Sequence, residues 1–218
     1  MTEKPILILD YDGTIHDTFY IYREAFLKGM EELARLGYIE KEEYSDEMIR
    51  GFIGMSVTDM WNAFKPELSD ERKDFGSRLV GDNMNIAILS GKAKLYPYAL
   101  DTLKSLKDDY ELMFLSNCPR GYMEAHIKAF CLQEIYDSFY CSGDYNDMPK
   151  EKILDIIKIP HRRYIVVGDR DKDRALAAYH NLSFIGCLYG YGSIEEFDGA
   201  DAVITDIREL PDALKNIL

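Results

Sequence analysis

Short apolar runs without polar alternation recur along this 218-residue chain at 6–9, 112–115, 164–167, 184–188 and 202–204. A strand with one wetted face alternates apolar and polar residues, whereas a strand covered on both faces is apolar throughout. Helical patterns lie between the later runs, with apolar residues recurring every three or four positions in 100–106 and 123–130. Alternating strands and helices predict an α/β fold with a parallel sheet and right-handed crossovers.

One interval breaks this alternation, because 17–89 contains no convincing strand. Apolar residues lie on one helix face in 22–33, and further helical patterns occupy 55–64 and 70–89. An interval of roughly 70 residues is far longer than a βα loop of about 2–6 residues. We therefore expect an inserted helical domain at 17–89, with Trp61 in its interior, and a catalytic domain formed by 1–16 and 90–218.

The charge balance restricts the partners of such a protein. There are 26 Lys and Arg residues against 39 Asp and Glu residues, a formal net charge of −13. Affinity for nucleic acid and for anionic membranes comes from basic side chains, so neither partner is expected. The early apolar run at 6–9 is too short for a signal-peptide core or a membrane span.

Four cysteines also bear on location. Cys118, Cys131, Cys141 and Cys187 show no CxxC spacing. In a chain of this size they indicate reduced thiols and predict a cytoplasmic protein.

Polar residues follow the predicted strands where each strand ends. The segment 10–14 follows the first run, 116–117 the second and 168–169 the third, while Asp173 comes four residues later and Lys150 begins a predicted helix. In an open α/β sheet, ligands bind outside the carboxyl ends of the strands. We therefore expect carboxylates, a hydroxyl and one amine to converge at this edge.

Crowded carboxylates repel one another unless a cation lies between them, and Mg²⁺ prefers hard oxygen ligands. A cation held by carboxylates, with a lysine and a hydroxyl nearby, can bind a phosphoryl group. Phosphoryl transfer requires mainly positioning and charge neutralisation. No GxxxxGK[ST] motif occurs, which excludes a P-loop nucleotide site.

Four motifs carry a resemblance to a known family. They are DYDGT at 10–14, FLSN at 114–117, Lys150 within PKEKIL, and VVGDRDKD at 166–173. In this order the chain resembles the haloacid dehalogenase-like (HAD) phosphohydrolases with a helical cap after the first motif. GYGS at 190–193 and DAVITDIREL at 201–210 are similar to the phosphoglycolate phosphatase-like subgroup. The resemblance implies a Rossmann-like parallel sheet sandwiched by helices, with an inserted α-helical cap domain.

The resemblance also implies a metal site. Asp10 would be the nucleophile and a Mg²⁺ ligand, and Asp12 the general acid/base with its backbone carbonyl on the metal. Asp169 would bind Mg²⁺, and Asp173 would bind it or orient it.

The same resemblance assigns the phosphate site. Ser116 and Lys150 would hold the transferring phosphoryl group, helped by backbone amides around Tyr11 and Asn117. Thr14 would brace the loop after the nucleophile.

The leading hypothesis is a Mg²⁺-dependent phosphatase, a monomer or homodimer, acting on a small phosphorylated metabolite through an aspartyl-phosphate. Phosphoglycolate, sugar phosphates, nucleoside monophosphates and pyrophosphate are candidates. The alternatives are a β-phosphoglucomutase-type phosphomutase and a non-catalytic protein of the same fold. A signalling receiver has similar acids but about half this length.

Several residues near the motifs carry no such expectation. His16, His126, His161 and His180 have no ligand spacing and are expected to be structural or exposed. His16 alone follows the first motif closely, so the alternative that it faces the site stays open for this residue. Gly190 and Gly192 are expected to be turn glycines rather than a phosphate cradle.

Overall fold

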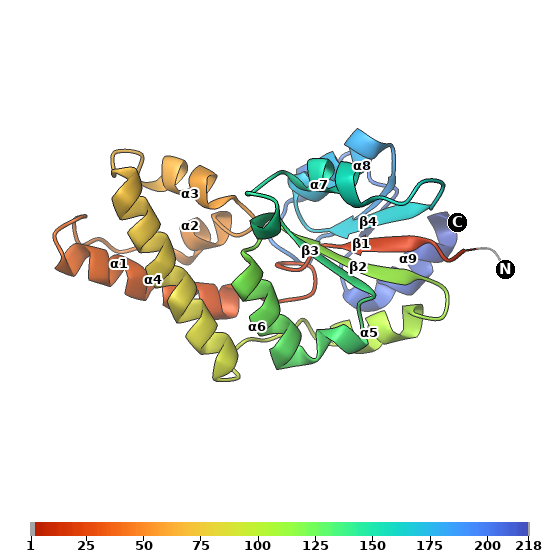
Figure 1. Ribbon diagram of the computed structural model, residues 1–218, viewed down its shortest axis with the longest axis horizontal. Helices are drawn as coiled ribbons and strands as arrows, with labels where there is room; N and C mark the ends of the chain where they lie inside the picture. Colours follow the sequence, from red (N-terminus) through yellow and green to blue (C-terminus); the bar gives the residue numbers. More distant parts are fainter. Residues whose placement is uncertain (1–2, 218) are drawn as a thin grey trace. The chain divides into compact units, whose positions relative to one another are not determined.

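A computed structural model describes residues 3–217 as two compact units (Figure 1). The sheet unit contains the described residues up to Asp17 and from Leu95 onward, and the helical unit is Thr18–Lys94. The helical unit extends past the boundary expected at residue 89. Lys92 Nζ lies 3.6 Å from a Glu24 carboxylate oxygen, and Lys94 Nζ lies 3.9 Å from the centre of the Tyr20 ring. These contacts join residues after the last helix of the unit to its first helix.

The sheet unit contains six parallel strands in the order β3-β2-β1-β4-β5-β6. The strands are β1 (Ile6–Leu9), β2 (Glu111–Ser116), β3 (Ser138–Cys141), β4 (Tyr164–Gly168), β5 (Ser183–Cys187) and β6 (Ala202–Ile204). β1 and β4 are buried along their whole length, as the apolar runs predict. The predicted α/β fold with a parallel sheet is confirmed.

One strand, β3, was not predicted from the sequence. β3 forms the edge of the sheet beside β2, and only Cys141 of its four residues is buried. An edge strand has one neighbour and is partly exposed, so it lacks the continuous apolar run that marks a central strand.

Helices cover both faces of the sheet. They are α5 (Ala99–Leu106), α6 (Arg120–Phe130), α7 (Lys150–Ile157), α8 (Asp171–His180) and α9 (Leu210–Ile217), with short 3₁₀ turns η1 (Leu132–Glu134), η2 (Ser142–Asp144), η3 (Ile194–Phe197) and η4 (Ile207–Glu209). Figure 1 shows α7 and α8 on one side of the sheet and α5 and α6 on the other. Ile6 and Ile8 belong to the same buried cluster as Ile153 of α7 and Leu176 of α8.

The helical unit has an aromatic interior. Its helices are α1 (Phe19–Arg35), α2 (Asp46–Gly51), α3 (Val57–Phe64) and α4 (Asp70–Leu89). The Phe26 ring lies 5.4 Å from Phe64 and 5.7 Å from Phe52, measured between centroids. Trp61 is 1% exposed and donates its indole N–H to Ser77 Oγ at 2.7 Å, as expected for an interior residue. The six-residue α2 was not predicted, because it is too short to show a periodic pattern.

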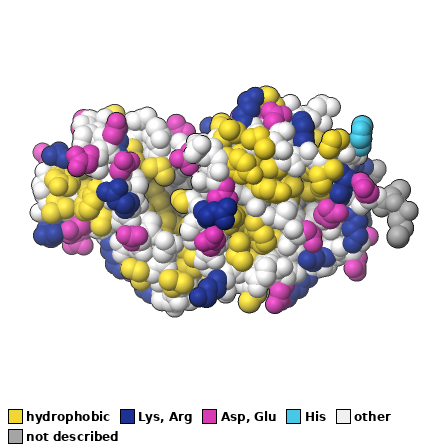
Figure 2. Space-filling view, in the orientation of Figure 1, with side chains coloured by type: hydrophobic (Ala, Val, Ile, Leu, Met, Phe, Trp, Pro, Cys, Tyr) yellow, Lys and Arg dark blue, Asp and Glu magenta, His cyan; other side chains and the backbone are white. Residues whose placement is uncertain are grey.

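The length and polarity of the helices and the distribution of surface charge can both be compared with the expectations from composition. Among the described residues, every helix is too short or too polar to cross a bilayer. On the face drawn in Figure 2, acidic and basic side chains are interspersed, and the basic ones form no continuous stripe.

A buried imidazole joins α6 to the loop after β1. His126 is 0% exposed, and its Nδ1 lies 2.8 Å from the hydroxyl of Tyr11. Its Nε2 has no hydrogen-bond partner among residues 3–217. Burial, together with the nearby His16, lowers the pKa of His126 from 6.5 to about 3.

The packing of α4 leads to a first prediction. A Cβ on Gly76 would lie 2.7 Å from Trp61 Cζ2 and 3.1 Å from Leu33 Cδ1, whereas a Cβ on Gly81 of the same helix would meet nothing within 4 Å. Gly76→Ala should therefore destabilise the helical unit by about 1–2 kcal/mol, because a buried ring must shift. Gly81→Ala should stabilise it by about 0.5–1 kcal/mol through helix propensity.

Urea denaturation followed by the fluorescence of Trp61, the single tryptophan, measures both variants. Equal shifts in the two denaturation midpoints would contradict the packing argument.

The buried imidazole leads to a second prediction. The unfolded chain binds a proton at His126 near pH 6.5, whereas the folded chain does so only near pH 3. Stability should therefore be greatest above pH 6.5 and fall as the pH decreases toward 3, by up to about 1.4 kcal/mol per pH unit from this group.

His126→Asn retains a polar group that can hydrogen-bond to Tyr11 but does not titrate, so its stability should depend less steeply on pH in that window. The exposed His161→Asn is the control, and urea denaturation between pH 4 and 7 is the measurement. Identical pH slopes for wild type and His126→Asn would exclude this role for His126.

Candidate active site

The candidate site lies at the carboxyl ends of β1, β2 and β4. β1 is hydrogen-bonded to β2 on one side and β4 on the other, so the loops that follow these three strands meet. Asp10 follows β1, Ser116 ends β2 and Asp169 follows β4. Asp173 lies in the first turn of α8, and Lys150 is the first residue of α7.

Three buried carboxylates form the acidic cluster, defined as Asp10, Asp169 and Asp173. One oxygen of each lies within 4.8 Å of the others. Burial, together with Asp173, raises the pKa of Asp10 to about 7, and burial with Asp10 and Asp173 raises that of Asp169. A set of oxygen donors whose negative charge is unfavourable without a cation fits Mg²⁺.

Lys150 connects two members of the cluster. Its ammonium donates to Asp10 Oδ1 at 2.6 Å and to Asp173 Oδ1 at 2.7 Å, and the residue is 3% exposed. Burial alone lowers the pKa of Lys150, but the two carboxylates outweigh it and hold the pKa above its usual value. The cluster therefore has a permanent positive charge on one side.

Backbone surrounds Asp169 on several sides. The amide N–H of Tyr191 donates to Asp169 Oδ2 at 2.7 Å, and the Thr14 hydroxyl donates to Oδ1 at 3.3 Å. Gly13 has φ +88°, and a Cβ there would lie 2.1 Å from Asp169 Oδ2. Only glycine permits both this backbone conformation and this approach.

The structure requires glycine at positions 190 and 192 for a different reason from the one expected. Both follow β5 near a turn, but neither has a positive φ. A Cβ on Gly190 would lie 2.4 Å from Asp169 Cβ, and one on Gly192 would lie 2.0 Å from the Asp169 carbonyl oxygen. These glycines therefore allow the chain after β5 to pass directly against Asp169, which the expectation of ordinary turn glycines missed.

Asp173 is held from two directions. Its Oδ1 accepts from Lys150, and its Oδ2 accepts the backbone N–H of Arg170 at 3.2 Å. The second bond joins this carboxylate to the backbone amide of the N-cap residue of α8, as in a capping box. Gly168 makes room for this carboxylate, because a Cβ there would lie 2.2 Å from Asp173 Cγ.

The remaining predicted residues lie on the same loops, outside the three-carboxylate cluster. Ser116 is buried at the end of β2, and Asn117 is half-buried. The Tyr11 side chain points into the interior toward His126, so its backbone is the part available to a ligand. Asp12 has a side chain that is 16% exposed.

Asp12 has two close neighbours, of which only His16 had been considered from the sequence. Its Oδ1 accepts from the Tyr122 hydroxyl at 2.7 Å and lies 3.0 Å from His16 Nδ1. His16 was expected to be structural or exposed, and it is fully buried beside this carboxylate. Its position four residues after Asp12 was the only signal, and no sequence signal connected Tyr122 to the site.

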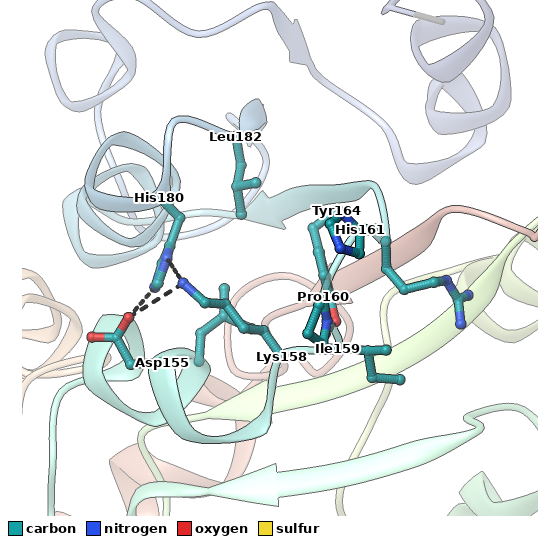
Figure 3. Close-up of a pocket in the computed structure, with 10 residues that line it drawn as sticks. Asp155, Lys158, Ile159, Pro160, His161, Tyr164, His180 and Leu182 are labelled. Atoms are coloured by element: carbon teal, nitrogen blue, oxygen red, sulfur yellow. Dashed lines mark hydrogen bonds and ion pairs between the residues drawn. The ribbon is translucent and has the colours of Figure 1, made fainter.

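A separate hollow lies at the opposite end of the strands. It is lined at the start of β4 by Tyr164 and by residues around Lys158, His161 and His180. Figure 3 shows Lys158 and His180 linked to Asp155. None of the predicted site residues lines this hollow.

Solved structures share this architecture. A predicted phosphatase from Clostridium acetobutylicum has a TM-score of 0.83 and 21% identity, with 98% of this chain and 99% of that chain covered. A predicted phosphoglycolate phosphatase from Haemophilus somnus has a TM-score of 0.78 and 18% identity, with coverage of 98% and 99%. CbbY from Rhodobacter sphaeroides, solved in complex with phosphate, has a TM-score of 0.77 and 21% identity, with coverage of 98% and 100%. At identities this low, the structural similarity shows a common fold and nothing about function.

Comparison with curated proteins finds no match. A model of the family described as haloacid dehalogenase-like hydrolase matches residues 7–187. This match spans most of the chain and includes all four motifs. The three residues of the acidic cluster belong to the first and fourth of these motifs. The chain therefore belongs to the haloacid dehalogenase-like hydrolases.

Proposed function

We propose that this protein is a Mg²⁺-dependent phosphatase that hydrolyses a small phosphomonoester through an aspartyl-phosphate on Asp10. The observation that carries the proposal is the acidic cluster with Lys150 bound to two of its members. Asp10, Asp169 and Asp173, with the backbone carbonyl of Asp12, would hold Mg²⁺. When bound, this ion would neutralise charge on the phosphoryl oxygens.

Asp10 is proposed to act as the nucleophile. In the first step its carboxylate oxygen forms a bond to phosphorus, and the bond from phosphorus to the ester oxygen breaks. Asp12, two residues later on the same loop, gives its proton to the departing oxygen. The products are a free alcohol and phosphorylated Asp10.

The second step reverses the role of Asp12. Its carboxylate removes a proton from a water molecule, the water oxygen bonds to phosphorus, and the bond to Asp10 breaks. Inorganic phosphate is released and both aspartates return to their starting states.

The phosphoryl group needs positive or hydrogen-bond-donating neighbours throughout. Lys150, Ser116 and the backbone amides near Tyr11 and Asn117 are proposed to supply them, with Thr14 bracing Asp169. Donors that are held in place before the reaction stabilise developing charge without reorganisation.

Similar proteins support a small phosphorylated substrate. One structural relative is described as a predicted phosphoglycolate phosphatase, and another was solved with phosphate. Phosphoglycolate is therefore the first candidate, followed by sugar phosphates, nucleoside monophosphates and pyrophosphate. Four free cysteines, three of them buried, support the proposal that the enzyme is cytoplasmic. We further propose that it acts as a monomer or homodimer.

Phosphate release from a panel of these substrates and p-nitrophenyl phosphate tests the proposal. Wild type should release phosphate with Mg²⁺ and lose this activity in EDTA. Asp10→Asn should reduce the rate by at least about a thousandfold, because it removes the nucleophile. The exposed Asp155→Asn is a control for the loss of one carboxylate.

Mg²⁺-dependent turnover by Asp10→Asn at the wild-type rate would refute the assignment of the nucleophile. Isomerised sugar phosphate in place of inorganic phosphate would instead identify a phosphomutase.

Metal binding can also be measured without turnover. An ion that binds only the folded protein raises its melting temperature, by roughly 5 °C or more when Mg²⁺ exceeds its Kd a hundredfold. Asp169→Asn should abolish this Mg²⁺-dependent rise, while Asp155→Asn should keep it. A full rise in Asp169→Asn would show that Mg²⁺ binds elsewhere.

A further inference from the structure

Two side chains bind the same oxygen of Asp12. The Tyr122 hydroxyl donates to Asp12 Oδ1 at 2.7 Å, and His16 Nδ1 lies 3.0 Å from that atom. The Tyr122 oxygen and His16 Nδ1 are themselves 3.1 Å apart, so the three groups form a closed triangle. Because an ionised carboxylate can only accept, both neighbours donate to it.

The two donors reach Asp12 from different elements. Tyr122 lies in the first turn of α6, which begins directly after Pro119 and the short loop that follows Ser116 at the end of β2. His16 lies four residues after Asp12 in the segment leading out of the loop. Their separation of more than a hundred residues along the chain means that the triangle exists only in the folded sheet unit.

Neighbouring rings hold both donors in place. His16 is 0% exposed, with its ring stacked 5.5 Å from Tyr11 at an interplanar angle of 15°. The ring of His126 lies 4.4 Å from His16 and 4.4 Å from Tyr122. Close packing of this kind leaves the rings of His16 and Tyr122 little freedom to turn.

A carboxylate held by two donors at one oxygen cannot rotate about Cβ–Cγ without breaking both bonds. The plane of the Asp12 carboxylate is therefore set by the protein before any substrate arrives. An oxygen that already accepts two hydrogen bonds is also the less favourable position for a proton. In the acid form of Asp12, the proton then belongs on Oδ2.

We propose that Tyr122 and His16 are positioning residues for Asp12, which fix its carboxylate plane so that Oδ2 carries the proton given to the departing ester oxygen. This inference rests on the proposed phosphatase function. It gives a positioning role in that reaction to two residues outside the four motifs. The proton passes from Asp12 Oδ2 to the ester oxygen as the bond to phosphorus breaks, and neither positioning residue gains or loses a proton.

If Tyr122 and His16 position Asp12, the loss of activity on substituting either residue should depend on the leaving group of the substrate. An alkoxide is a poor leaving group and needs its proton during bond cleavage, whereas p-nitrophenolate is stable without one. Misplacing the acid should therefore slow alkyl esters selectively, whereas a disturbed phosphate or metal site would slow both substrates. The value of kcat/KM is the appropriate measure, because it covers events up to departure of the leaving group.

The test compares wild type and Tyr122→Phe on 2-phosphoglycolate, glycerol phosphate and p-nitrophenyl phosphate with saturating Mg²⁺. Tyr122→Phe should lower kcat/KM for the alkyl esters about ten- to a hundredfold and for p-nitrophenyl phosphate by less than about threefold. Tyr164→Phe is the matched control. Tyr164 is a buried tyrosine whose hydroxyl accepts the Ile159 N–H at 2.8 Å at the opposite end of the strands.

His16 provides a second, independent variant pair. His16→Asn can still present an N–H near the position of Nδ1, whereas His16→Leu cannot. The asparagine variant should retain more of the alkyl-ester activity than the leucine variant, with equal melting temperatures confirming that both are folded.

The outcomes separate the inference from the function on which it rests. Equal losses on alkyl and aryl esters, or no loss on either, in folded Tyr122→Phe would overturn the positioning role while the phosphatase stands. Wild type that releases no phosphate from any ester would refute the proposed function itself.

Discussion

The bonds from Lys150 to Asp10 and Asp173 are the interaction on which the site depends. Three carboxylates converge where β1 and β4 end, and two of them would repel across a buried gap without this ammonium. Removing one partner of a buried ion pair leaves a charge without compensation, which typically destabilises a protein by about 3–5 kcal/mol. The start of α7 is thereby tied to both β1 and α8. One ammonium among three carboxylates still leaves this region acidic, so binding of an anion in the proposed site would require Mg²⁺ as well as Lys150.

Much of this arrangement follows from the order of residues. Strands buried on both faces must be apolar throughout, so the central strands β1 and β4 were visible as runs, and parallel strands must bring their carboxyl ends together. Asp10, Asp169 and Asp173 could therefore be expected at one edge before any contact was known. The 20-residue α4 was predicted to its ends, because a long helix has room to repeat its pattern.

What could not be predicted depends on contacts between distant segments. β3 and α2 are short and partly exposed, so neither produces a pattern distinct from a loop. Tyr122 meets Asp12 only because α6 packs beside the loop after β1, and periodicity contains no information about that neighbour. The close approach of Gly190 and Gly192 to Asp169 could not be predicted either. In a sequence, a glycine needed for close approach cannot be distinguished from a glycine needed for a turn.

The surroundings of Asp169 have a consequence for ion size. Gly13 and Gly190 bring backbone against this side chain, and the Tyr191 amide holds one of its oxygens. A carboxylate confined in this way cannot move outward to follow a larger ion. Mg²⁺ binds oxygen at about 2.0–2.1 Å, whereas Ca²⁺ requires about 2.3–2.6 Å and more ligands. If the proposed metal site is correct, the backbone packed against Asp169 at Gly13 and Gly190 would favour the smaller ion without any additional ligand.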